Sequence, residues 1–208
     1  MERKLIIADL LRKAWQSLTA QIWVLAGLMI GYTIISLLLT CTMPYVSYPG
    51  RTALGLASTL FTLVFVLGYL KNLFQALDGE EPQFSAYGQM SRKVFALFFA
   101  YIFYWIIVGI GLVLLIVPGI YIGLRLVFAP QIIVEENAGA IASLRRSWEI
   151  TRGATGQVFK LVLAGCGLLL LGNMAFGIGI FLAIPLVNLM MCAAFRQLTQ
   201  AGRSIAEE

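Results

Sequence analysis

The stretch that decides the fold is "VFALFFAYIFYWIIVGIGLVLLIVPGIYIGLRLVFAPQIIV", residues 94–134, which contains a single charged residue. It is 41 residues long, whereas about 20 residues are enough to cross the hydrocarbon core of a bilayer. Pro118 and Gly119 form a pair that is typical of a tight turn. The stretch therefore predicts a transmembrane hairpin, with one span near residues 94–116 and the next near residues 120–134.

The composition of the whole chain indicates the same environment. Hydrophobic residues make up 60% of the 208 residues, charged residues make up 12%, and the mean hydropathy is +0.89. A soluble domain has about 45–50% apolar and about 25% charged residues. A soluble globule of this size leaves too much surface in water to hide so many apolar side chains. The sequence thus predicts an integral membrane protein.

The remaining apolar runs predict four further spans, near residues 22–42, 53–70, 158–172 and 174–195. The last two come from one continuous run, which Gly172 and Asn173 divide near its middle. The expected fold class is all-α: a polytopic membrane helix bundle with six transmembrane helices plus cytoplasmic interfacial amphipathic helices. We expect residues 1–208 to form a single integral membrane domain.

The interfacial helices are expected near residues 3–18 and 138–152. Apolar residues recur at helical spacing in both segments and charged residues lie opposite them. These apolar residues are Ile7, Leu11, Ala14, Trp15 and Leu18 in the first segment, and Ile141, Leu144 and Trp148 in the second. Asn137 is expected to cap the second helix and Gly153 to end it.

The basic residues predict the orientation of the chain. If the N-terminus is cytoplasmic, 13 of the 15 basic residues lie on the cytoplasmic side, Arg51 lies on the opposite side and Arg125 lies within a span. This asymmetry follows the positive-inside rule, so both termini are expected to be cytoplasmic. The net charge of +5 then reflects orientation and attraction to anionic lipid headgroups. The sequence has no nucleic-acid-binding motif.

The residue types limit the chemistry that the chain can perform. There is no histidine, which excludes Ser-His-Asp and Cys-His arrangements and imidazole bases. No aspartate or glutamate falls inside a predicted span, which excludes a carboxylate dyad in the membrane. Cys41, Cys166 and Cys192 lack metal-ligand spacing. We therefore expect no enzyme activity, no metal and no cofactor.

Three motifs carry a resemblance to a known family: "ALDGEEP" at 76–82, "VPGIYIGLRLVFAPQIIVEE" at 117–136 and "AIASLRRSWEITRG" at 140–153. Residues 65–160 are similar to the membrane domain of bacterial glycerophosphoryl diester phosphodiesterases and to related small membrane proteins of unknown function. The matching positions are Gly79, Pro82, Pro118, Gly119, Arg125, Glu135, Ser147, Trp148 and Gly153. The resemblance implies a multi-span protein of the bacterial inner membrane. No soluble phosphodiesterase domain lies within the 208 residues, so the resemblance implies no enzyme activity.

Arg125 is the sharpest candidate for a functional residue. It lies six residues after Gly119, about 9 Å below the outer end of its span. Its side chain is expected to snorkel to the outer headgroups, to be neutralised by carbonyl groups at the Pro-Gly break, or to bind an anionic headgroup or solute. Arg145 and Arg146 are the other candidates for binding anions or lipid.

Two functions remain open after these observations. The first is a non-enzymatic accessory or scaffold protein that contacts anionic lipid headgroups or a protein partner in the membrane. The alternative is a transporter or lipid-handling protein with an anion or headgroup site near Arg125, supported by that arginine, by a helix kink expected at Pro185 and by a possible internal repeat, in which residues 11–15 resemble residues 144–148. The first is favoured because the predicted spans contain no acidic residue for ion coupling.

Overall fold

The computed structural model describes residues 6–174 and 179–206 of the chain. These residues form ten α-helices and two short 3-10 helices. The α-helices are α1 (Ile7–Ala20), α2 (Ile22–Thr42), α3 (Tyr48–Leu77), α4 (Ser85–Met90), α5 (Val94–Leu114), α6 (Ile116–Leu126), α7 (Ala129–Glu135), α8 (Ala140–Ile150), α9 (Thr155–Met174) and α10 (Ile180–Ala206). The 3-10 helices are η1 (Met43–Tyr45) and η2 (Ser91–Lys93).

Six helical segments are long and apolar enough to cross a membrane: Ile22–Tyr45, Tyr48–Leu77, Ser85–Leu114, Ile116–Glu135, Thr155–Met174 and Ile180–Ala201. Each predicted span overlaps one of these segments, and residues 175–178 of the last predicted span lie outside the described residues. The predicted all-α fold class with six apolar helices is therefore confirmed, and the chain is a multi-pass membrane protein by helix length and hydropathy.

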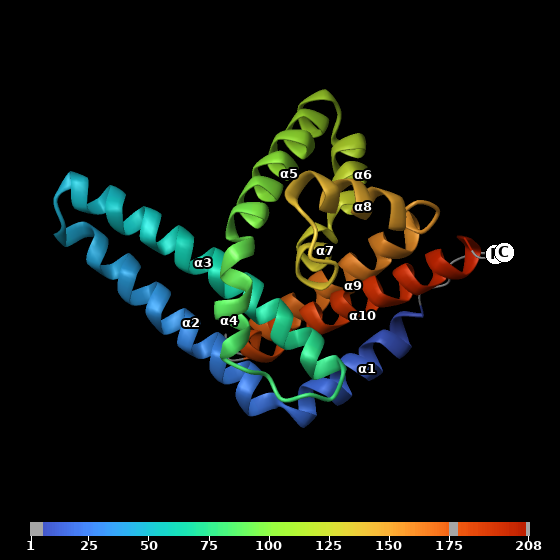
Figure 1. Ribbon diagram of the computed structural model, residues 1–208, viewed down its shortest axis with the longest axis horizontal. Coiled ribbons are helices and arrows are strands. Elements are labelled where there is room, and N and C mark those ends of the chain that lie inside the picture. The colour runs from blue at the N-terminus through green and yellow to red at the C-terminus, as the bar shows by residue number, and fades with distance from the viewer. Residues whose placement is uncertain (1–5, 175–178, 207–208) are drawn as a thin grey trace.

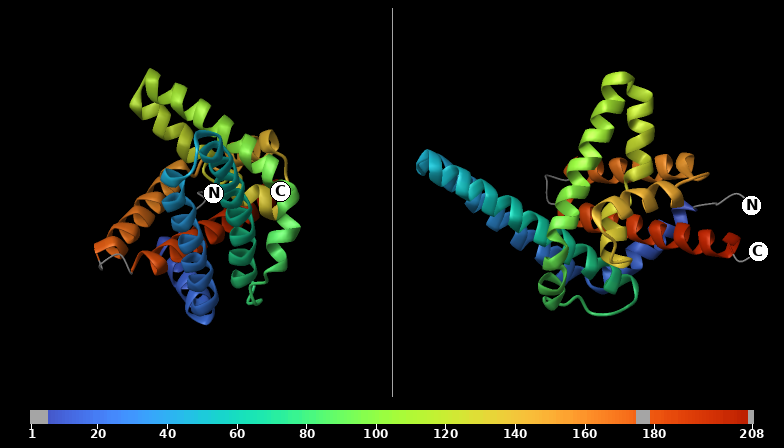
Figure 2. Two further views of the ribbon diagram at one scale, coloured as in Figure 1. Left: turned by 90° about the vertical axis from the view of Figure 1, so that its left-hand side faces the viewer. Right: turned by 45° about the horizontal axis from the view of Figure 1, so that its top comes forward.

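The helices α2 and α3 form one long hairpin, and α5 and α6 form another (Figure 1). The two hairpins point in different directions, which is also clear in the right-hand view of Figure 2. The helices α1, α3, α7 and α10 meet where the hairpins join. Side chains from all four are fully buried there, among them Leu10, Leu18, Leu67, Leu73, Ile132, Ile133, Leu189 and Phe195.

The helix α1 packs with a face that matches the predicted one in part, because Ala14 and Leu18 are buried and Ile7 and Leu11 pack against the core. Leu10, Ala14 and Leu18 are fully buried at four-residue spacing, whereas Trp15 is half exposed. The apolar pattern of the sequence was broad enough to include both faces. Packing against α10 and α3 selects the narrower row of smaller side chains.

The turn between α5 and α6 lies at Leu115, whose backbone is extended with φ −163° and ψ 143°. The turn predicted at Pro118 and Gly119 is therefore wrong, because both residues lie inside α6. Proline is tolerated in the first turn of a helix, where the backbone N–H groups have no intrahelical acceptor. Gly119 instead permits close helix contact, since a Cβ atom there would lie 2.6 Å from the backbone nitrogen of Leu112.

Other local predictions also need correction. The helix α9 continues through Gly172 and Asn173 to Met174, so the predicted turn is not at those residues, and the α9–α10 connection lies outside the described residues. The N-cap of α8 is Gly139, without a side-chain cap bond, and Asn137 has a left-handed backbone with φ 56°. Gly153 has φ 81° in the turn after α8, as expected for a glycine that ends a helix.

Candidate functional site

The fourth span is interrupted within the bundle. The helix α6 ends at Leu126 and α7 begins at Ala129. Pro130 explains the interruption, because its ring would clash with the carbonyl group of Leu126 in a continuous helix and it has no N–H to donate. Irregular backbone at membrane depth is tolerated only where protein or a cavity satisfies its polar groups.

Two fully buried side chains of α8, Ser147 and Thr151, supply hydrogen bonds to backbone groups at the interruption. The Ser147 hydroxyl accepts from the Phe128 N–H at 3.2 Å and donates to the Arg125 carbonyl oxygen at 2.8 Å. The Thr151 hydroxyl donates to the Ser147 carbonyl oxygen at 2.7 Å and lies 3.2 Å from the Arg125 carbonyl oxygen. We call Arg125, Phe128, Ser147 and Thr151, together with Trp148, the clasp.

The Arg125 side chain is only 6% exposed and completes the clasp. Its Nη2 donates to the Trp148 carbonyl oxygen at 2.5 Å, and its Nη1 donates to the Tyr121 hydroxyl at 2.9 Å. The guanidinium carbon lies 4.1 Å from the centroid of the Trp148 ring, within the range of a cation–π interaction. Carbonyl and aromatic groups of the protein therefore surround this charge.

This environment corrects two of the expectations for Arg125. The side chain is directed to the C-terminal end of α8, so it does not extend to the N-terminal end of α6, where the outer headgroups were expected, and does not bond carbonyl groups at Pro118 and Gly119. The distance of Arg125 from the start of its helix also changes. Because α6 begins at Ile116, Arg125 lies about 14 Å from the first residue of α6, and not about 9 Å as expected from a span that begins after Gly119. The carbonyl groups at a helix C-terminus favour a cation, which explains the preference for α8.

A second polar cluster joins the C-terminal ends of α3 and α7 to the middle of α10. Arg196 donates to both carboxylate oxygens of Asp78, one at 2.8 Å, and to Glu135 Oε1 at 2.7 Å. The hydrogen bonds from Arg196 lower the pKa of the Asp78 carboxyl below its ordinary value. The Arg196 guanidinium also lies over the ring of Phe74, at 5.1 Å.

The polar cluster borders an open pocket of about 700 Å³, lined by Asp78, Glu135, Glu136, Arg146, Phe195, Arg196, Thr199 and Gln200. Arg146 lies here because it pairs with Glu136 at 3.4 Å. Acidic and basic side chains neutralise each other around most of the pocket. Among the described residues, no group of three or more histidine, cysteine or acidic side chains is arranged to hold a metal ion.

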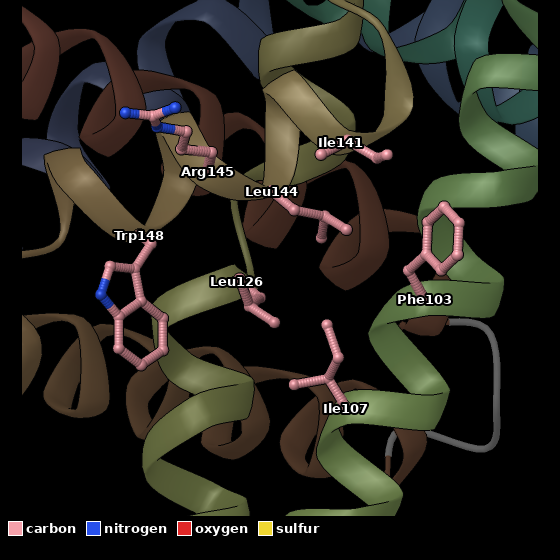
Figure 3. A pocket seen from close by; sticks show the side chains of 7 residues that line it. All are labelled: Phe103, Ile107, Leu126, Ile141, Leu144, Arg145 and Trp148. Carbon is pink, nitrogen blue, oxygen red and sulfur yellow. The ribbon is translucent and has the colours of Figure 1, made fainter.

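An apolar groove lies between α5 and α8, with a volume of about 390 Å³. We call it the α8 groove; it is lined by Phe103, Ile107, Leu126, Ile141, Leu144, Arg145 and Trp148 (Figure 3). Leu144 and Ile107 point toward one another across it, and Arg145 lies at its rim with the guanidinium directed away. The Arg145 side chain is 83% exposed and pairs with Glu149 at 3.3 Å.

The three candidate arginines thus lie in three different environments. Arg125 is inside the clasp, Arg145 is at the rim of the α8 groove, and Arg146 faces the polar pocket. Among the motif residues, Ser147 and Trp148 belong to the clasp and Glu135 belongs to the polar cluster. Gly79 has φ 78° in the turn after α3, and Pro82 lies in the following loop.

Sequence reasoning missed several residues that build these sites. Thr151 lies one helical turn after Ser147, and this spacing of hydroxyl residues was the available signal. Pro130 was the available signal for the helix interruption. The pairing of Asp78 with Arg196, 118 residues apart, left no signal in the local pattern.

The family model of a domain of unknown function, DUF7847, matches residues 54–207. The matched region runs from within α3 to α10, so it contains the clasp, the polar cluster and the α8 groove. No curated protein and no solved structure matches the chain. The resemblance to the membrane domain of phosphodiesterases stays a prediction.

Proposed function

We propose that this chain, which belongs to the DUF7847 family of unknown function, is a non-enzymatic membrane scaffold that binds an anionic phospholipid at helix α8. The observation that carries the proposal is the α8 groove, an apolar channel with an exposed guanidinium at its rim. The groove accommodates part of an acyl chain, and Arg145 contacts the phosphate outside it. A planar guanidinium is well suited to a phosphate, which accepts two parallel hydrogen bonds.

The surroundings of the α8 groove favour lipid as the occupant. Ile141 on α8 and Trp105 on α5 are well exposed, as expected for side chains that face acyl chains. Trp148 is partly exposed at the groove, and tryptophan is enriched at the membrane interface. The ion pair between Arg145 and Glu149 is exposed, so it contributes about 0–1 kcal/mol and does not prevent a phosphate from binding.

An anion site at Arg125, the alternative function, has less support. The Arg125 guanidinium is buried and already donates to Trp148 and Tyr121. A phosphate would have to replace these contacts inside a buried site. Two observations support a non-enzymatic role. The buried hydroxyl groups of the clasp are already hydrogen-bonded within the protein, and the sequence contains no histidine.

The orientation and the compartment are part of the proposal. With 13 of 15 basic residues on one side, the positive-inside rule supports cytoplasmic termini and a cytoplasmic α8. The resemblance to the phosphodiesterase membrane domain supports the bacterial inner membrane. A reporter that works only in the cytoplasm should be active when fused after Glu208 and inactive when inserted before Tyr48; activity at Tyr48 would contradict the orientation.

Native mass spectrometry of the purified protein tests the lipid site directly. Titration with phosphatidylglycerol should give a saturable adduct that phosphatidylcholine does not give. Arg145→Ala should weaken phosphatidylglycerol binding about fivefold, because a basic residue near an anionic lipid contributes about 1 kcal/mol. Ile107→Trp, which fills the α8 groove, should also weaken binding.

Arg152→Ala is the matched control. Arg152 is exposed in the turn after α8 and does not line the α8 groove, so the variant loses the same charge from the same surface. Equal weakening by Arg145→Ala and Arg152→Ala would show only diffuse attraction to anionic lipid. If a protein copurifies with the chain and no lipid adduct forms, the lipid proposal is wrong and the scaffold binds a protein partner.

A further inference from the structure

Several buried polar side-chain atoms have no hydrogen-bond partner in the described part of the chain, and two of them lie close together in the bundle. Gln131 in α7 and Tyr69 in α3 are each 5% exposed, and the unpartnered atoms are the Gln131 Oε1 and the Tyr69 hydroxyl. A buried polar group without a partner costs about 1–3 kcal/mol, and native proteins satisfy nearly all of them. These two atoms therefore point to something that binds between the helices.

Gln131 lies between two adjoining cavities of about 210 Å³ and about 290 Å³. Both cavities are lined by Tyr101, Pro130, Gln131 and Asn188, so they meet along these residues. The smaller cavity continues to Tyr69, and the larger one continues to the helix interruption at Val127. We call the pair the bundle cavity.

The lining of the bundle cavity is mainly apolar with a few polar groups, and it contains no charged residue. Its polar groups are the carboxamides of Gln131 and Asn188 and several tyrosine hydroxyls. The Asn188 Nδ2 donates to the Ile184 carbonyl oxygen at 2.9 Å, next to Pro185 in α10. The interrupted span formed by α6 and α7 and the proline-containing helix α10 thus border the same cavity. Transport proteins often place their substrate sites at helices that are broken in this way.

We propose that the bundle cavity binds a small uncharged organic molecule that carries a hydroxyl or amide hydrogen-bond donor on an apolar body. The unpartnered Gln131 Oε1 requires a donor, and the Tyr69 hydroxyl takes either role. The rings of Tyr32, Phe65 and Tyr101 supply apolar walls. An ion is excluded because a charge buried without a counter-charge is strongly unfavourable. This site is separate from the lipid site of the proposed function.

Three neutral probes that share one ring test the chemical class. Benzyl alcohol, phenol and benzamide carry a donor, and toluene is the matched probe without one. Saturation-transfer NMR on the protein in zwitterionic micelles should detect saturable binding of at least one donor probe, above the linear background from the micelle. Toluene should bind about tenfold more weakly, since a site built to hydrogen-bond its ligand rejects an analogue that lacks the donor.

Two variants assign the binding to the bundle cavity. Tyr69→Phe and Gln131→Leu should each weaken the donor probe about tenfold and leave toluene within about twofold. Tyr69→Phe removes only one oxygen, so it keeps the test valid if Gln131→Leu does not fold. Ser58→Ala removes a hydroxyl from α3 that does not line the bundle cavity, and it should change nothing.

The possible results separate this proposal from others. No saturable binding of any donor probe, or equal binding of toluene, would overturn it and leave the bundle cavity as a site for ordered water. Arg145→Ala should not affect the donor probe, because Arg145 lies at the α8 groove. The proposal of a lipid site and the proposal of a ligand in the bundle cavity can therefore be refuted independently.

Discussion

Replacement of Ser147 by alanine should destabilise the protein far more than the loss of one surface hydroxyl would. Ser147 is fully buried, and its hydroxyl group connects α8 to both sides of the interruption between α6 and α7. The substitution removes the acceptor of the Phe128 N–H and one donor to the Arg125 carbonyl oxygen. Water cannot easily replace either partner inside the bundle.

The expected loss follows from these two bonds. An unsatisfied buried N–H costs about 1–3 kcal/mol, and a lost hydrogen bond costs about 1 kcal/mol. The Thr151 hydroxyl still lies 3.2 Å from the Arg125 carbonyl oxygen, which reduces the second contribution. We therefore expect Ser147→Ala to lower the free energy of unfolding by about 2 kcal/mol, or about thirtyfold in the folded-to-unfolded ratio.

Ser143→Ala is the matched control in the same helix. Ser143 is also fully buried, but its hydroxyl bonds only the Ala140 carbonyl oxygen in its own helix, at 2.7 Å. Because alanine favours helix more than serine does, this variant should change the free energy of unfolding by about 0.5 kcal/mol or less. Unfolding of both variants in mixed micelles by increasing sodium dodecyl sulfate, followed by tryptophan fluorescence, gives the comparison.

Hydrogen exchange supplies a local measurement. In Ser147→Ala the amide of Phe128 should exchange faster, whereas amides in the middle of α9 should not change. Equal destabilisation of the two variants would refute the reasoning, since it would mean that the bonds across the interruption do not stabilise the fold.

Three further predictions concern other features of the fold. Arg125→Lys should lower the free energy of unfolding by about 1–3 kcal/mol in the same assay, since a point charge cannot replace the planar guanidinium. Gly119→Ala should cost about 1–3 kcal/mol by forcing α5 and α6 apart, whereas Gly31→Ala, where a Cβ meets nothing within 4 Å, should cost nothing. The pair of Asp78 and Arg196 should stabilise fully above the unfolded pKa of about 4 and less as the pH falls through the lowered folded pKa; unfolding midpoints of Asp78→Asn should lack this pH dependence.

The positions of the apolar helices could be predicted because membrane spans depend mainly on local composition. A run of apolar residues must form a helix in lipid, whatever its partners are. The exact ends of the helices were harder to predict. The helix α3 continues to Leu77, beyond the predicted end at residue 70. Neighbouring helices bury Asn72 and Leu73 there, which a local hydropathy pattern does not reveal. Gly27 and Gly31 have the four-residue spacing that is typical of closely packed membrane helices, yet a Cβ at either position meets no atom within 4 Å.

The site was less predictable because its residues act through contacts distant in sequence. Arg125 stood out as a lone charge in an apolar run, but the direction of its side chain depends on the position of α8. The packing face of α8 includes Ser143 and Ser147, which a hydrophobic pattern assigns to the polar side. Ser147 is buried because its hydroxyl satisfies backbone groups, and this reason becomes visible only when α8 and the interruption are seen together.

The contact between α1 and α10 has a consequence for biosynthesis. The buried face of α1 packs largely against α10, which is the last of the described helices to leave the ribosome. At about 5–20 residues per second, α1 waits on the order of ten seconds for this partner. Until then only the smaller contacts with α2 and α3 can cover the apolar face of α1, so the arrival of α10 completes the burial of α1.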